Sequence, residues 1–274
     1  MSAPATHIVI PDTQVRPGVP TDHLKWIGRY IWDQFHDRSN VRVIHLGDHW
    51  DMPSLSSWDK PGSKSVEGRR YMDDVRAGNE ALSLLTETIE TRNANRRQNK
   101  KPQWRPDLHL LRGNHEDRIT RAVDEGPKWE GLVGMHHLES PGWIVHDFLK
   151  PVCLDGVWYA HYWSNPMNGR PMGGNAANRL NKLGRTCVMG HQQTLDYAIR
   201  FVGSQSQHFL VAGACYLHDE EYRSYQGNEA HWRGIVVLFQ VEDGSFDPMF
   251  VSLDFLCRKY EGKRLREFLD ARGE

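Results

Sequence analysis

The sequence has few cysteines and no long apolar run. Its 274 residues include four cysteines, which are widely spaced, lie in or near apolar segments and form no Cys-x-x-Cys pair. This spacing favours buried, reduced thiols. There is neither a basic-then-apolar leader nor an apolar run of about 18 residues, so we expect a soluble, cytoplasmic protein with no membrane partner.

A strong net charge is also missing. The chain has 34 basic and 35 acidic residues, so its overall charge predicts neither a nucleic-acid nor a membrane partner. Only a local cluster of charged residues could indicate such a partner. With 39% apolar residues, the chain is long enough to bury one sizeable core, and we expect one main domain.

Three short apolar runs in the first part of the chain stop at polar, reactive residue types. Each run predicts a buried strand, and the runs with the residues that follow them are 7–11 with Asp12, 41–46 with Asp48, and 108–111 with Asn114 and His115. In α/β architectures ligands bind beyond strand ends, because the strands are rigid and the loops after them are free to vary.

Helical spacing separates the first two of these runs. Leu24, Ile27, Ile31 and Phe35 recur on one face behind Thr21, which predicts a helix. The second half is strand-rich, with a short helix expected in the tail at 261–271. The expected strands there are 152–161, 186–189, 209–214, 234–241 and 249–253. The whole pattern predicts a mixed α/β domain.

About sixty residues lie between the second and third apolar runs, more than a crossover with one helix needs. We therefore expect an insertion at about 52–106, with a helix at 71–90. After that helix comes a stretch with no acidic residue, the basic run 92–105. Its cations are Arg92, Arg96, Arg97, Lys100, Lys101 and Arg105.

The residues at the strand ends have the chemistry of a metal site. Carboxylate, imidazole and amide groups suit a hard to borderline divalent cation, and no thiolate is needed. In chain order they are Asp12, Gln14, Asp48, Asp51, Asn114, His115, His161, His191 and Gln193.

The order and spacing of these residues are similar to the motifs of the calcineurin-like metallophosphoesterase superfamily. The segments that carry the resemblance are Asp12-x-Gln14, Gly47-Asp48-x-x-Asp51, Gly113-Asn114-His115-Glu116, His161 and Gly190-His191-x-Gln193. The superfamily pattern has histidine where this chain has Gln14 and Gln193. The resemblance implies a single domain over 1–274, with a two-sheet mixed β-sandwich flanked by helices.

The resemblance also implies roles for individual residues. Asp48 would bridge two metal ions, and Asn114, His161 and His191 would complete the second site. Asp12 would anchor the first site, where the amides of Gln14 and Gln193 are poorer ligands than imidazole, so that site is either weakly held or absent. Manganese is the expected ion, with iron, zinc or nickel as alternatives.

His115 is not a ligand in the superfamily pattern but the expected general acid, oriented by Asp51. Arg118 is three residues further on and could bind a phosphate oxygen, although an arginine on a new helix needs no such role. The implied reaction is phosphoester hydrolysis by metal-bound hydroxide.

The substrate is expected to be a phosphodiester, with nuclease action on nucleic acid bound through the basic run 92–105. Trp50, Trp58 and Trp104 could stack on bases, but packing is the simpler interpretation. One alternative is a phosphomonoesterase acting on phosphoprotein or nucleotide, although Met52 replaces the arginine that protein phosphatases have after Asp51. The other is a catalytically weakened binding or scaffold protein with the same fold.

Overall fold

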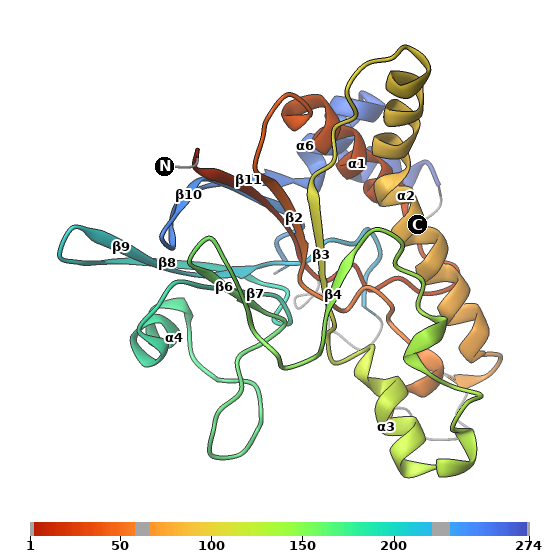
Figure 1. The fold of residues 1–274 in the computed structure, drawn as a ribbon. Helices are drawn as coiled ribbons and strands as arrows, with labels where there is room; N and C mark the ends of the chain where they lie inside the picture. Colours follow the sequence, from red (N-terminus) through yellow and green to blue (C-terminus); the bar gives the residue numbers. More distant parts are fainter. Residues whose placement is uncertain (1–2, 58–65, 221–230, 273–274) are drawn as a thin grey trace.

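The computed structural model describes residues 3–57, 66–220 and 231–272. Two β-sheets lie face to face, with helices covering their outer sides (Figure 1). The predicted mixed α/β class, with two mixed sheets flanked by helices, is confirmed.

The first sheet has six strands in the order β11-β10-β1-β2-β3-β4. The strands β1 to β4 run parallel, and β10 and β11 add to β1 as an antiparallel pair. Their bounds are β1 Ala5–Ile10, β2 Val41–His45, β3 Asp107–Leu111, β4 Ile144–His146, β10 Gly234–Glu242 and β11 Ser245–Ser252. All six residues of β1 are buried, Thr6 and His7 among them, as in a strand that is covered on both faces.

The second sheet has five strands in the order β5-β6-β7-β9-β8. Its three inner strands β6, β7 and β9 are parallel, and the edge strands β5 and β8 are antiparallel to their neighbours. Their bounds are β5 Val152–Leu154, β6 Val157–Ala160, β7 Cys187–Met189, β8 Leu195–Val202 and β9 Gln205–Ala212.

The core has three apolar layers. Val9 and Ile44 from the first sheet pack with Val188 and Leu210 from the second, and so join the two sheets. The opposite face of the first sheet packs under α1 (Asp22–Phe35), α2 (Tyr71–Gln98) and α6 (Leu253–Glu261). The outer face of the second sheet packs against α4 (Ala176–Leu183). The other helices among the described residues are α3 (Asp117–Glu125), α7 (Leu265–Asp270) and the short turns η1 (Pro53–Leu55), η3 (Pro127–Trp129) and η4 (Met135–His137).

Two glycines allow close packing around α2, Gly28 of α1 against α2 and Gly78 of α2 against the loop after β2. A Cβ at Gly28 would lie 2.4 Å from the carbonyl oxygen of Leu85, and one at Gly78 would lie 1.9 Å from the ring of Trp50. Trp50 is only 2% exposed, and its indole nitrogen donates to Asn79. Trp50 is therefore a packing residue.

The described part of the segment 52–106 is mostly the 28-residue helix α2, which runs beyond the predicted end at 90 and includes part of the basic run. Trp104 follows it, packs against Trp32 with 5.9 Å between ring centroids and donates to the carbonyl of Arg38. It too is a packing residue, whereas Trp58 lies outside the described residues.

Several elements were not predicted. The strands β4 and β8 and the helix α4 lie in segments for which no element was expected, and α6 begins at the last residue of the strand expected at 249–253. The run predicted as one strand at 152–161 is a hairpin of β5 and β6 around Asp155 and Gly156. Cys153 is exposed on edge strand β5, so the prediction of buried thiols holds only for the other three cysteines. Within residues 3–57, 66–220 and 231–272, no helix is long and apolar enough to cross a membrane.

Candidate metal centre

Five loops that follow parallel strands meet between the two sheets. Asp12 follows β1, Asp48 follows β2 and Asn114 follows β3, whereas His161 and His191 follow β6 and β7 of the second sheet. The carboxyl ends of parallel strands lie at one edge of a sheet, so residues far apart in sequence are brought together there. The structure thus gathers the residues that carried the resemblance.

Asp48, His161 and His191 form the closest group. Each offers one ligand atom, and these atoms all lie within 4.8 Å of one another. His161 Nε2 is 3.2 Å from Asp48 Oδ2 and 2.9 Å from Asn114 Oδ1. This group could hold a metal ion, because a carboxylate, two imidazoles and an amide oxygen converge on a small volume.

The orientation of His161 is fixed by the backbone. Its Nδ1 lies 2.9 Å from the carbonyl oxygen of Leu46, which sets the tautomer with the proton on Nδ1. Nε2 then faces Asp48 and Asn114, and in the neutral ring this nitrogen would be the metal ligand. A hydrogen bond of this kind is common behind metal-binding histidines, where it holds the ring and raises the basicity of the free nitrogen.

The charges of the cluster favour a cation. Burial alone would lower the pKa of His161, but Asp48 and Asp12 outweigh it and raise that pKa to about 9. Burial, with a contribution from Asp48, raises the pKa of Asp12 to about 7. Burial and the nearby His161 lower the pKa of His191 to about 4. His191 is therefore a neutral imidazole, the form that binds metal, and a cation at this site would favour the ionised form of the buried Asp12 carboxylate.

The first half of the predicted centre, Asp12 with Gln14 and Gln193, consists of oxygen acceptors. Asp12 Oδ2 and Gln14 Oε1 are buried and have no hydrogen-bond partner among the residues that the structure describes. Gln193 Oε1 accepts a hydrogen bond of 3.1 Å from the hydroxyl of Tyr216. An unpaired buried acceptor costs about 1–3 kcal/mol, so Asp12 and Gln14 fit a cation that binds oxygen.

The backbone is unusually close and strained around these side chains. A Cβ at Gly113 would lie 2.1 Å from Asp48 Oδ1, and one at Gly190 would lie 2.3 Å from Asp12 Oδ1. Several non-glycine residues here also have positive φ: Gln14, Asp48, Met52, His191 and Gln193. Backbone strain from positive φ costs about 1–3 kcal/mol for each residue and is concentrated at functional sites.

His115 and Asp51 form a pair beside the cluster. His115 Nδ1 is 2.6 Å from Asp51 Oδ1, and its Nε2 is 3.7 Å from Asp48 Oδ2. Burial lowers the pKa of His115, but Asp48 and Asp51 outweigh this effect and raise it above its usual value. Asp51 also accepts from Arg16 at 2.9 Å. The imidazole is thus oriented by Asp51, with Nε2 turned to the cluster.

Arg118 lies at the site. Its Nη1 donates to the carbonyl oxygen of Asp51 at 2.7 Å, and its Nη2 is 3.1 Å from His115 Nε2. The side chain is 11% exposed, which rules out the interpretation of Arg118 as a solvated helix arginine.

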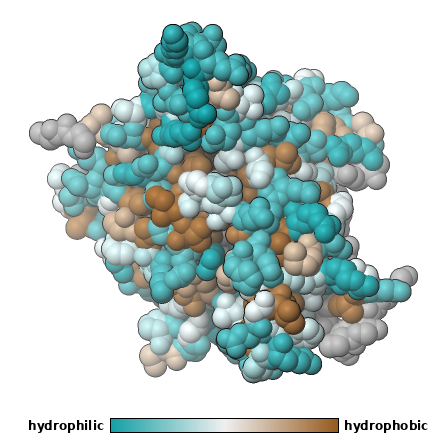
Figure 2. Space-filling view, turned by 45° about the vertical axis from the view of Figure 1, so that its right-hand side comes forward, coloured by the Kyte–Doolittle hydropathy of each residue, from teal (hydrophilic) through white to brown (hydrophobic). Residues whose placement is uncertain are grey.

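The basic run 92–105 lies elsewhere. The run ends just before β3 begins, whereas Asn114 lies beyond the last residue of β3. The run and the candidate centre are therefore at opposite ends of this strand (Figure 1). Several of its cations bind within the run: Arg96 to the carbonyl of Pro102, and Arg97 to Gln103. In the space-filling view this end of the molecule, at the top, is mostly teal, and brown residues gather lower on the same face (Figure 2). The run comprises the last residues of α2 and the segment after it, and it lies at the opposite end of β3 from the candidate centre.

Sequence reasoning missed the role of Glu116. Its buried carboxylate accepts hydrogen bonds of 2.6–3.1 Å from the backbone nitrogens of Asp48, His49, Trp50 and Gly113. It therefore fastens the loop after β2 to the loop after β3. The glutamate of Gly-Asn-His-Glu was visible in the sequence, but its partners depend on the tertiary structure.

A second missed group lies behind the loop after β2. Thr13 Oγ1 is 2.7 Å from His49 Nδ1 and 3.1 Å from His45 Nε2, and His49 Nε2 is 2.9 Å from the carbonyl oxygen of Gly78. These buried contacts join the loop after β2, which carries Asp48, to Thr13 and to α2.

Comparisons with known proteins add no family assignment. The chain matches no protein-family model, and no curated protein matches it.

Proposed function

We propose that this chain is a divalent-metal-dependent phosphodiesterase of the calcineurin-like metallophosphoesterase class. The observation that carries the proposal is the convergence of Asp48, Asn114, His161 and His191 next to the His115–Asp51 pair. Metal binding alone would not require that pair. Its presence favours an enzyme over a scaffold protein that has kept only the fold.

The ligand set suits manganese, because carboxylate, imidazole and amide oxygen are combined. A bound divalent cation would supply a Lewis acid for the phosphoryl oxygens and lower the pKa of a water molecule that it holds. Asp48, Asn114, His161 and His191 would hold this ion. Asp12 and Gln14 would hold a second ion more weakly, since a neutral amide oxygen is a poor substitute for imidazole.

His115 would act on the leaving group. Its Nε2 faces the cluster and accepts from Arg118 in the neutral ring; in the imidazolium form a proton on this nitrogen would pass to the departing oxygen while Asp51 keeps the ring in place. The adjacent Arg118 cation favours release of that proton, and Asp48 and Asp51 favour its retention. Arg118 also lies where it can neutralise charge on a phosphate.

The proposal is tested by manganese-dependent hydrolysis of bis-p-nitrophenyl phosphate and p-nitrophenyl phosphate, with metal content measured on the same samples. We expect turnover of the diester, and a loss of roughly 1,000-fold in kcat for Asp48→Asn, because the cation is no longer held. Faster hydrolysis of the monoester would contradict the diesterase proposal and indicate a phosphomonoesterase. Metal-loaded protein that hydrolyses neither ester would contradict the enzyme proposal and favour the scaffold.

The role of His115 has its own signature. p-Nitrophenolate leaves without a proton, whereas the alkoxide released from dithymidine monophosphate needs one. We expect His115→Ala to lower kcat by roughly 100-fold for the dinucleotide and much less for the nitrophenyl diester. His136→Ala, at an exposed histidine, is the matched control. Equal losses on both substrates would show that His115 is not the proton donor.

A further inference from the structure

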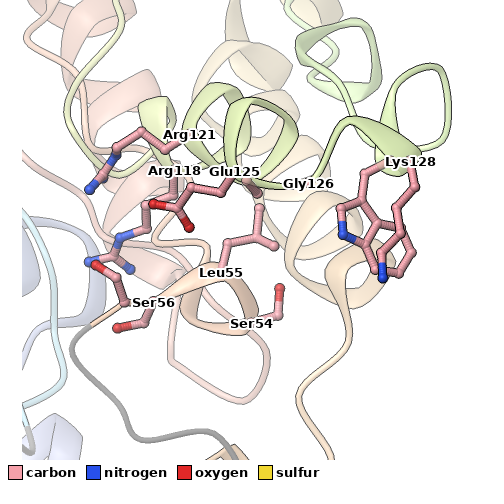
Figure 3. A pocket seen from close by; sticks show the side chains of 11 residues that line it. Ser54, Leu55, Ser56, Arg118, Arg121, Glu125, Gly126 and Lys128 are labelled. Atoms are coloured by element: carbon pink, nitrogen blue, oxygen red, sulfur yellow. The ribbon is translucent and has the colours of Figure 1, made fainter.

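A cleft opens directly beside His115. Its volume is about 600 Å³, and it is lined by residues of η1, α3 and η3, among them Leu55, Arg118, Arg121, Lys128 and Trp129 (Figure 3). Arg118 forms the wall shared with the candidate centre, since its guanidinium contacts His115 at 3.1 Å. A group that enters the cleft would therefore be continuous with one bound at the metal cluster.

The cleft has an excess of positive charge. Its lining contains three cationic side chains, Arg118, Arg121 and Lys128, and one acidic side chain, Glu125. Arg121 is 45% exposed and pairs with Asp117 at 3.4 Å, an exposed ion pair that exchanges easily for another anion, and its Nη2 donates to the carbonyl oxygen of Asn114 at 3.0 Å. Lys128 is also exposed. Two cations are thus available to an anionic group in the cleft.

An exposed indole lies at the far end of the cleft. Trp129 is 45% exposed, and Lys128 Nζ lies 5.1 Å from its ring centroid. A Cβ at Gly126 would lie 2.7 Å from Trp129 Cδ1, so the ring edge packs against the backbone of the turn. This arrangement combines an aromatic surface with nearby cations, as in proteins that bind single-stranded nucleic acid.

The place of the cleft decides which part of a substrate it can receive. If His115 protonates the leaving oxygen, the group attached to that oxygen lies on the His115 side and points to Arg118. A leaving group that suits the cleft has a negative charge, followed by a flat ring. A nucleotide within a strand has both, and only a single strand exposes the face of its base for stacking.

We propose that this cleft binds the nucleotide on the leaving side of the scissile phosphodiester in single-stranded nucleic acid. Arg121, on the Arg118 side of the cleft, binds its next phosphate, and Trp129, with Lys128 beside its ring, stacks on its base. This inference rests on the proposed hydrolase function, and it places the nucleic-acid contact on α3 and η3 and not on the basic run 92–105.

The kinetic test compares a fluorescent oligothymidylate with bis-p-nitrophenyl phosphate, whose leaving group carries neither a second phosphate nor a nucleobase. We expect Trp129→Ala to raise the KM for the oligonucleotide about five- to twenty-fold. The ratio of the two kcat/KM values should fall by a similar factor. Trp129→Phe, which retains a stacking ring, should restore most of the loss. Equal effects of Trp129→Ala on both substrates, or no effect on either, would overturn the proposal.

The charges are tested with Arg121→Ala/Lys128→Ala against Arg97→Ala/Lys100→Ala in the basic run. The first pair should raise the oligonucleotide KM about ten-fold at low salt and make it less dependent on salt concentration. The second pair should change it less than about two-fold. A larger effect from the second pair would move the nucleic-acid contact back to the basic run and overturn the proposal.

A binding measurement separates this inference from the hydrolase function. Fluorescence anisotropy of labelled dT10 with cleavage-resistant phosphorothioate linkages and the manganese-loaded wild type should give a Kd at least about five-fold tighter than with Trp129→Ala. If the nitrophenyl diester is hydrolysed and dT10 binds equally to both proteins, the hydrolase stands and the nucleotide subsite fails. If dT10 binds as expected and no ester is hydrolysed, the subsite stands and the hydrolase fails.

Discussion

The two halves of the candidate centre share Asp48 but differ in chemistry. In the second half, His161 and His191 bring imidazole nitrogens close to Asp48, and Asn114 adds an amide oxygen. In the first half, Asp12 is joined by Gln14 and Gln193. The contrast shows that similar loops after parallel strands carry strong imidazole ligands in one half and only oxygen ligands in the other.

The supports of the halves also differ. Asp48 and Asn114 lie in loops that Glu116 fastens through four backbone nitrogens. Asp12 is held through its own groups: its carbonyl oxygen accepts from Cys215 N at 2.8 Å, and its Oδ1 accepts from His191 N at 3.0 Å. The second half is thus built from rigidly bound loops, and the first half leaves two acceptor oxygens unpaired.

The largest expected effect comes from breaking the support of the second half. Glu116→Gln keeps the shape of the side chain but removes the charge behind four buried hydrogen bonds. We expect the free energy of unfolding to fall by about 2–4 kcal/mol, measured by urea denaturation. Asp117→Asn, at the next residue, should change it by less than about 0.5 kcal/mol. Equal stabilities for the Glu116 and Asp117 variants would show that the loops are held by other contacts.

The next effect sets one half directly against the other. His191→Ala removes an imidazole of the second half, and Gln193→Ala removes an amide of the first half only two residues away. We expect His191→Ala to weaken manganese binding by roughly 30-fold, by analogy with losses at metal-supporting residues, and Gln193→Ala by less than about three-fold. Isothermal titration calorimetry measures both. The reverse order would mean that the first half is the stronger site.

The smallest expected effect is a gain. Gln14→His places an imidazole beside the unpaired oxygen of Asp12, and so makes the first half more like the second. We expect the affinity of the weaker manganese site to rise about three- to ten-fold, seen in calorimetry as a more complete second equivalent. The control is Gln192→His, at the residue between His191 and Gln193, whose side-chain oxygen accepts a hydrogen bond from Arg179. If both variants behave like the wild type, the first half does not hold a cation.

The sequence was most informative where one strand and the residue after it carried the signal. The ends of β1, β2 and β3 were predicted because apolar runs stop abruptly at Asp12, Asp48 and Asn114. The structure also brings His161 and His191 to the same place, as the motif order predicted. Strand ends are local features, so a single sequence can mark them.

Features that depend on distant partners were not predicted. The edge strand β8 has mostly half-exposed residues, so it lacks the apolar run of a central strand. The four hydrogen bonds of Glu116 join two loops, and nothing in the local sequence specifies them. The basic run 92–105 was given a substrate role by composition alone, whereas cations nearer the centre on α3 and η3 are mixed with acidic residues and stood out less.

The most direct test of the account is anomalous diffraction at the manganese edge from crystals soaked in manganese. We predict a strong peak bounded by Asp48, Asn114, His161 and His191, and a weaker peak or none beside Asp12 and Gln14. Crystals of Asp48→Asn should lack the strong peak. Manganese found only at another histidine pair, such as the stacked His109 and His146, would contradict it.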